Sequence, residues 1–303
     1  MLTVEHFHKL FESGLTYQHS SERWAALIQK ESTLFPSPRR EVRSNGDVFV
    51  EELIQPLLRP MIFTPAEVRQ VEDLAEAWEK LVCLQFQMIK EGMADIAAGK
   101  SYTPLAKLAE QIVPENERIF AMHDPGYSHP ISPFIRLDMV RTPAGFRPVD
   151  INTTRPAGMG DHILLDEAYA QSGNYKFFSV ADNFRTTMKT CFDSWCEGTS
   201  TRECARIGIL LDEGAGDYTN FFNLALLLEG RSWVEKVELI TDVPDPKDRK
   251  FNCLLRSRVK VGHPLFSKLL ALPATDFCVI TPLGRRFIGN KLWFVALKNS
   301  IFG

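Results

Sequence analysis

The stretch FIRLDMVRTPAGFRPVDINTTRPAGMGD, residues 134–161, carries the most specific pattern in this chain of 303 residues. Its first part contains two segments in which apolar and polar residues alternate, and the residues Thr-Pro-Ala-Gly separate them. Alternation with a period of two is typical of β-strands, and Pro and Gly favour a turn between them. The stretch therefore predicts a β-hairpin.

The register of this hairpin decides which side chains share a face. With Ala144 at the centre of the turn, Asp138 faces Asp150 and Arg136 faces Asn152, and all four side chains lie on one face. Two like charges directly opposite one another destabilise a sheet unless something compensates them. A shift of one residue would break this arrangement. The other face is expected to bury Ile135, Leu137, Met139, Val149 and Ile151.

The polar face has the composition of a metal and phosphate site. Two carboxylates and an amide oxygen form a hard oxygen site, which Mg²⁺ accepts when substrate phosphates complete its octahedral shell. A guanidinium beside them suits phosphate, because it can bind two oxygens at once. This set fits metal-assisted phosphoryl transfer. The spacing alone leaves one alternative open, a solvated hairpin face with an incidental Arg–Asp pair.

Composition and charge exclude several other classes. The chain is 45% hydrophobic and 24% charged with a net charge of −3, the balance of a soluble globular protein. It has no basic block, so nucleic-acid binding lacks electrostatic support, and its apolar runs are too short to span a bilayer. We expect a cytoplasmic protein with reduced thiols, because its first residues do not resemble a secretory signal. A zinc site at Cys191, Cys196 and Cys204 is not favoured, because no fourth ligand lies nearby in the sequence.

The order of predicted elements indicates an α/β protein with two compact units as the default expectation. Residues 1 to about 120 are predicted to be helical, beginning with a stripe formed by Val4, Phe7, Leu10 and Phe11. The clearest helix is expected to follow a capping box of Thr64 and Glu67 and to end at Gly99. A shorter helix is expected from Thr103. After residue 200, strand, helix and strand follow one another, which predicts a right-handed crossover and a parallel sheet.

The spacing R-x-D, a second acid twelve residues after the Asp, then x-N resembles the magnesium-binding hairpin of ATP-grasp ligases. More closely, IRLDMVRTPAGFRPVDINTTRPAG resembles the circularly permuted ATP-grasp group that includes the glutathionylspermidine synthase family. The resemblance continues through RIGILLDEGAGDYTNFFNLALLLEG and FNCLLRSRV to TPLGRRFIGNKLWFVAL. It covers roughly residues 126–300 and implies a partial ATP-grasp subdomain at 126–200 and a Rossmann-like pre-ATP-grasp subdomain with the start of the next subdomain at 201–303. The N-terminal region at 1–125, predicted to be helical from its residue pattern, resembles no known family.

The resemblance also implies an activity and a set of site residues. The activity is ligation: ATP phosphorylates a small-molecule or peptide carboxylate, an amine attacks the acyl phosphate, and an amide forms. Positively charged groups would stabilise the charge that develops in the transition state. The implied residues are Asp138, Asp150 and Asn152 for Mg²⁺, Arg136 for catalysis at the transferred phosphate, Lys291 for ATP phosphate, and Arg256 for holding substrate.

The chain departs from the family pattern in two respects. Most relatives have Glu where this chain has Asp150, so the metal is expected closer to the strand or bound by one oxygen only. The sequence also ends soon after Lys291, before the glycine-rich ATP lid, so we expect a fragment of a longer ligase. The alternatives left open are a non-catalytic binding or scaffold protein of the same fold and a metal-dependent phosphohydrolase that needs no amine. Formation of a homo-oligomer also stays open.

Overall fold

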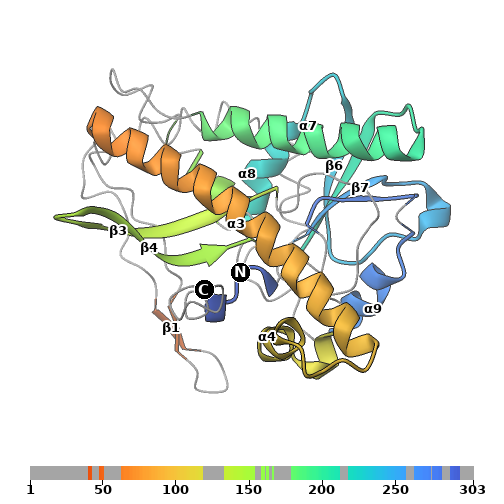
Figure 1. Ribbon diagram of the computed structural model, residues 1–303. Helices are drawn as coiled ribbons and strands as arrows, with labels where there is room; N and C mark the ends of the chain where they lie inside the picture. Colours follow the sequence, from red (N-terminus) through yellow and green to blue (C-terminus); the bar gives the residue numbers. More distant parts are fainter. Residues whose placement is uncertain are drawn as a thin grey trace.

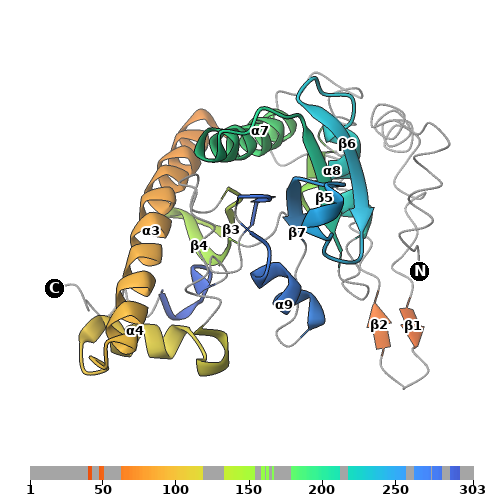
Figure 2. The ribbon, with the colours of Figure 1, turned by 90° about the vertical axis from the view of Figure 1, so that its right-hand side faces the viewer.

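The structure is a computed structural model with helices, two antiparallel hairpins and a parallel sheet, so the predicted α/β class is confirmed at this level. In Figure 1 the long helix α3 crosses in front of the hairpin β3–β4, and Figure 2 shows this hairpin between α3 and the parallel sheet. The structure describes residues 40–42, 48–50, 63–118, 133–153, 158–160, 162–163, 166, 179–211, 218–256, 263–273, 275–281 and 287–293.

The parallel sheet has the strand order β6-β5-β7-β8. Its strands are β5 (Ala205–Leu210), β6 (Val234–Ile240), β7 (Cys253–Arg256) and β8 (Cys278–Val279), and every neighbouring pair is parallel. Helix α8 (Tyr218–Leu228) lies between β5 and β6 in the chain, so the predicted strand–helix–strand unit is confirmed. Strand β7 is buried along its whole length, as is typical of a parallel strand covered on both faces.

Helices cover both faces of this sheet. One core contains residues of α7 (Val180–Thr199) and α8 together with Cys253 and Leu255 of β7. The core on the other face contains Leu254 together with residues of α3 (Pro65–Ala97), α4 (Pro104–Ile112) and α9 (Pro264–Leu270). Successive side chains of a strand point to opposite faces, and this alternation divides β7 between the two cores.

Helix α3 begins as the sequence predicted. The Thr64 hydroxyl accepts a hydrogen bond from the backbone N–H of Glu67 at 3.3 Å, and the Glu67 carboxylate accepts one from the backbone N–H of Thr64 at 2.8 Å. These two bonds are the predicted capping box. After the end of the helix, Gly99 has a φ of +74°, a conformation that favours glycine. The shorter helix predicted from Thr103 is also confirmed, as α4.

A third hydrophobic cluster joins α3 to the β3–β4 hairpin. Trp78, Val82 and Phe86 of the helix are buried against Ile151 of the hairpin and against Ile288. Helix α3 also contributes to the core that it forms with α4 and α9 on one face of the sheet, here called the core beneath the sheet. The third cluster therefore holds the hairpin in a fixed position relative to the sheet. The candidate site is therefore built on packed elements.

The structure corrects some predictions and adds elements. The expectation of helix throughout residues 1 to about 120 is wrong at β1 (Arg40–Val42) and β2 (Val48–Val50), which pair as antiparallel strands. Valine and phenylalanine, which make up β2, favour extended backbone. Helix α9, strand β8 and the 3₁₀ helices Glu115–Glu117 and Pro246–Asp248 were not predicted.

Other predictions fall on parts of the chain that are not described. The stripe at residues 4–11 lies outside the described residues. The division at residues 125 and 200 remains a prediction. Helix α7 precedes residue 201 yet packs in one core with β5, so hydrophobic contacts cross that boundary. No helix among the described residues has the length and apolar character needed to cross a membrane.

Candidate functional site

The hairpin consists of β3 (Arg136–Thr142) and β4 (Gly145–Asn152), and its register at the polar end is the predicted one. Asp138 pairs with Asp150, and Arg136 pairs with Asn152. The prediction that the two carboxylates face each other across the ladder is therefore confirmed. These pairs lie at the end of the hairpin remote from its turn.

The turn and the middle of the hairpin differ from the prediction. Gly145 pairs with Thr142, so the turn is centred between Pro143 and Ala144 instead of on Ala144. The register shifts next to Asp138, where a bulge accommodates the extra residue Val149. Val149 is 51% exposed, so the expectation that it belongs to the buried face is wrong. A bulge re-aims side chains in this way, and it restores the predicted register at the acid pair.

Arg136 and Asp138 form one ion pair of the site. The guanidinium donates two hydrogen bonds to the carboxylate, from Nε at 2.8 Å and from Nη2 at 3.2 Å. The two residues are neighbours on one face of the same strand, and their side chains are 50% and 40% exposed. A two-point contact of this kind fixes the plane of the guanidinium relative to the carboxylate.

Asp150 has a different set of partners. Its Oδ1 accepts a hydrogen bond from the backbone N–H of Ile151 at 3.0 Å, and its Oδ2 lies 3.5 Å from Nζ of Lys291. The structure thus brings Lys291 to the acid pair from a distant part of the sequence. Each carboxylate of the facing pair has a cation beside it, and these cations offset the repulsion that the facing acids would otherwise cause.

The segment 287–293 positions Lys291 through its neighbours. Ile288 is fully buried, and a Cβ atom on Gly289 would lie 3.0 Å from the backbone oxygen of Ile151, so this segment runs close against β4. The side-chain amide of Asn290 donates a hydrogen bond to the backbone oxygen of Ile112 at 3.3 Å. These contacts anchor the backbone on both sides of the site, and the lysine side chain extends from an anchored segment.

Asn152 completes the polar end of the hairpin. Its amide nitrogen is buried and has no hydrogen-bond partner. Leaving a buried polar group unpaired costs about 1–3 kcal/mol, so such a group is a candidate for contact with a ligand. The side chain has hydrogen-bonding capacity that the protein atoms around it do not use.

The oxygen ligands at this end of the hairpin suit a divalent cation that takes its remaining ligands from water or substrate. Among the described residues, no group of three or more His, Cys, Asp or Glu side chains is arranged to hold a metal ion. The hairpin offers two carboxylates and one amide, so the rest of a six-oxygen shell must come from water and substrate. Mg²⁺ is commonly bound in this way, through one or two carboxylates with phosphate oxygens and water.

Arg256 lies in the parallel sheet and not on the hairpin. It is the last residue of β7, its side chain is buried, and its Nε donates a hydrogen bond to the backbone oxygen of Thr281 at 2.5 Å. Its register partner in β5 is Leu210. From β5 the chain continues to β6 on one side of β5 and then crosses to β7 on its other side. Open α/β sheets commonly bind ligands at the carboxyl ends of the strands where the strand order reverses in this way, and Arg256 lies at that point.

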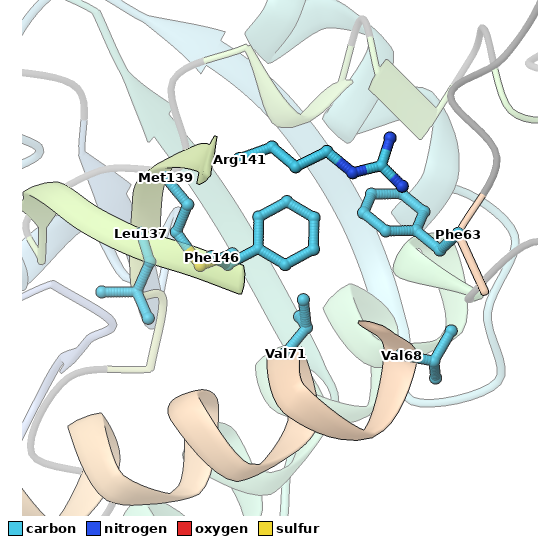
Figure 3. A pocket seen from close by; sticks show the side chains of 7 residues that line it. All are labelled: Phe63, Val68, Val71, Leu137, Met139, Arg141 and Phe146. Carbon is cyan, nitrogen blue, oxygen red and sulfur yellow. The ribbon is translucent and has the colours of Figure 1, made fainter. Parts of the chain in front are cut away.

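A cavity of about 320 Å³ lies on the other face of the hairpin, between its outer end and the start of α3. Figure 3 shows the side chains that form it, among them Phe63, Val71 and Phe146. Arg141 contributes the one cation of this lining, and its Nε donates a hydrogen bond to Glu67 at 2.6 Å. None of the predicted site residues lines this cavity. The alternation of Leu137 and Met139 indicates an apolar face here, but it gives no sign of a cavity between this face and α3.

The three cysteines considered as zinc ligands differ in their exposure. Cys191 is buried, Cys196 is partly exposed and Cys204 is exposed, and all of them are free thiols. Burial raises the pKa of Cys191 to about 12, and burial likewise raises the pKa of Cys278 well above its usual value. Thiols with raised pKa values are poor nucleophiles and poor metal ligands, because both roles need the thiolate.

Comparison with known proteins gives no family assignment, since the chain matches no protein-family model and no curated protein sequence.

Proposed function

We propose that this chain is an ATP- and Mg²⁺-dependent carboxylate–amine ligase that forms an amide through an acyl phosphate. One observation carries the proposal: Asp138 and Asp150 face each other across a packed hairpin, with Arg136 and Lys291 beside them. Facing carboxylates weaken a sheet unless cations offset their repulsion, and a simpler apolar or neutral pair would need no such cations. A charged ligand therefore explains this arrangement better than stability does.

The proposed roles follow from the chemistry of each group. Asp138, Asp150 and Asn152 would hold Mg²⁺, which when bound neutralises charge on the phosphate oxygens of ATP. Arg136 would bind the phosphoryl group in transfer through its planar fork, and Lys291 would bind a second phosphate as a point charge. Both cations belong to elements held by the hydrophobic cluster around Ile151 and Ile288, so the backbone that carries them is in place before the substrate arrives.

The reaction balances in two steps. A carboxylate oxygen of the first substrate attacks the terminal phosphorus of ATP, and the bond to ADP breaks. The amine of the second substrate then attacks the acyl carbon, inorganic phosphate leaves with the bonding electrons, and the nitrogen loses a proton. A carboxylate resists amines until its oxygen becomes a good leaving group, which explains the need for ATP. Arg256 is the proposed group for a substrate carboxylate, at the carboxyl end of β7.

Trapping with hydroxylamine tests this proposal without knowledge of the natural amine. The protein is incubated with Mg²⁺, ATP and a panel of amino acids and short peptides, and hydroxylamine replaces the amine. We expect ATP-dependent formation of a hydroxamate together with ADP. Replacing Asp150→Asn should abolish it, whereas Asp248→Asn, a change of the same kind at an exposed residue of a 3₁₀ helix, should leave it unchanged.

The same assay separates the alternatives. Release of phosphate from ATP with no hydroxamate and no need for an amine would indicate a phosphohydrolase. Failure to bind Mg²⁺ and ATP in equilibrium dialysis would indicate a binding or scaffold protein of this fold. Unchanged turnover in the Asp150→Asn variant would refute the assignment of the metal site, whichever reaction the protein catalyses.

A further inference from the structure

The two ion pairs of the candidate site are unequal. Arg136 holds Asp138 by two hydrogen bonds, and both residues belong to strand β3. Lys291 approaches Asp150 at 3.5 Å through a single pair of atoms, and its side chain is 72% exposed. Exposed ion pairs with a single contact are weak, so the pair of Lys291 and Asp150 is the one that breaks easily.

The backbone around Lys291 is held while its side chain is not. Gly289 lies against the backbone of Ile151, and the indole N–H of Trp293 donates a hydrogen bond to the backbone oxygen of Phe287 at 3.2 Å. Lysine carries its charge on a flexible stem of four carbons. The ammonium can therefore leave Asp150 and stay within reach of the same site, without movement of the segment 287–293.

From this difference we propose that Lys291 is a displaceable counter-cation of Asp150. The ammonium and a divalent cation compete for the same carboxylate, and the ammonium released by the metal ion binds a phosphate of the nucleotide. This inference rests on the proposed function of the hairpin. It makes Lys291 oppose the binding of the metal ion alone and support the binding of the metal ion together with ATP.

The Lys291→Met variant tests the competition, because methionine keeps much of the apolar stem and removes the charge. Binding of Mn²⁺ alone is measured from the signal of the free ion in electron paramagnetic resonance. We expect the variant to bind Mn²⁺ about two- to fivefold more tightly than the parent protein, the range that follows from breaking one exposed ion pair. Binding of a non-hydrolysable ATP analogue in the presence of Mn²⁺ should weaken in the same variant.

The matched control is Lys107→Met on α4, which removes an exposed lysine of another element. It should change neither affinity, which excludes a general effect of net charge. Equal or weaker Mn²⁺ binding in Lys291→Met would overturn the competition while leaving the metal hairpin in place. Absence of Mn²⁺ binding in both the parent protein and Lys291→Met would overturn the proposed function and this inference together. Loss of Mn²⁺ binding on adding Asp150→Asn to the variant would support Asp150 as the shared ligand.

Discussion

Single residues at the start of α3 connect a helix cap to the hairpin. The carboxylate of Glu67 accepts hydrogen bonds from the backbone of Thr64 and from Arg141 of β3. The backbone hydrogen bond from Thr64, followed by the hydrogen bond from Arg141, lowers the pKa of Glu67 below its ordinary value. One side chain thus completes the capping box and also anchors the outer end of the hairpin.

This arrangement predicts a pH dependence for the Glu67→Gln variant. A carboxyl group whose pKa is lowered by folding adds stability above its unfolded pKa, about 4.3, and this stability is lost as the pH falls through the folded pKa. Glutamine can keep the cap hydrogen bond but not the charge. We therefore expect the variant to be less stable than the parent protein at pH 7 and pH 5, and the difference to vanish as the pH falls below the folded pKa. Urea unfolding at several pH values measures it.

Glu72→Gln, at an exposed residue of the same helix, is the control and should show no such trend. A stability difference for Glu67→Gln that persists unchanged at pH 3 would contradict the electrostatic explanation. It would indicate that the loss comes from packing or from the cap geometry.

At the same scale, the sequence predicted the residues whose partners are local. Thr64 and Glu67 are three positions apart, and Asp138 and Asp150 are related by one turn, so spacing alone indicates their contacts. It did not indicate that Lys291 lies beside Asp150, because that contact depends on how the segment 287–293 packs against β4. Its approach to the site was an implication of the family resemblance.

Among the elements, α3 and α4 approach each other closely at Gly92. A Cβ atom added to Gly92 would lie 2.4 Å from the backbone oxygen of Leu105 and 2.7 Å from Cβ of Ala109. Backbone cannot yield as the tip of a flexible side chain can, so this glycine sets the separation of the two helices. The helices contribute jointly to the core beneath the sheet, and that separation therefore determines how α3 reaches both the sheet and the hairpin.

Gly92→Ala is therefore expected to destabilise the protein by about 1–3 kcal/mol, the usual cost of forcing extra volume into a packed contact. Helix propensity alone gives the opposite sign, because alanine is favoured over glycine in a helix by about 1 kcal/mol. The control is Gly198→Ala in α7, where an added Cβ meets no atom within 4 Å. It should be neutral or stabilising. Denaturant midpoints measure both, and a stabilised Gly92→Ala variant would refute the close packing.

The elements that the sequence predicted well are those with strong local signals. Helices α3, α4 and α8 have caps, a terminating glycine or a long apolar run, and they appear where expected. Strand β8 has two residues and exists through its pairing with β7, so no periodicity can indicate it. The bulge at Val149 was missed for a related reason, since period-2 alternation assumes a regular ladder.

Among the described residues, three hydrophobic cores share elements instead of standing apart. Helix α3 contributes Met88 and Ile89 to the core beneath the sheet and Trp78 and Val82 to the cluster on the hairpin. Strand β7 contributes to the cores on both faces of the sheet. Loss of any one core removes packing from an element that supports another, and this sharing favours cooperative unfolding of the described parts.

Tryptophan residues allow this cooperativity to be measured core by core. Trp195 lies in the core beneath α7, Trp293 in the core on the opposite face of the sheet, and Trp78 in the cluster on the hairpin. In protein labelled with 5-fluorotryptophan, ¹⁹F NMR resolves each side chain, and single Trp→Phe variants assign the signals. We expect the folded signals of these three residues to disappear at one urea concentration, which also matches the loss of helical circular dichroism.

The order in which the signals disappear shows whether α3 couples the hairpin cluster to the cores of the sheet. The hairpin cluster has the fewest buried members, so it is the core that would separate first if α3 did not couple it to the sheet. Loss of the Trp78 signal at a lower urea concentration than the Trp195 signal would contradict a single cooperative unit. Such a result would also mean that the hairpin carrying the acid pair opens independently of the sheet. The affinity of the parent protein for Mn²⁺ should then fall in parallel with the Trp78 signal. A common midpoint implies that the metal affinity persists until the sheet itself unfolds.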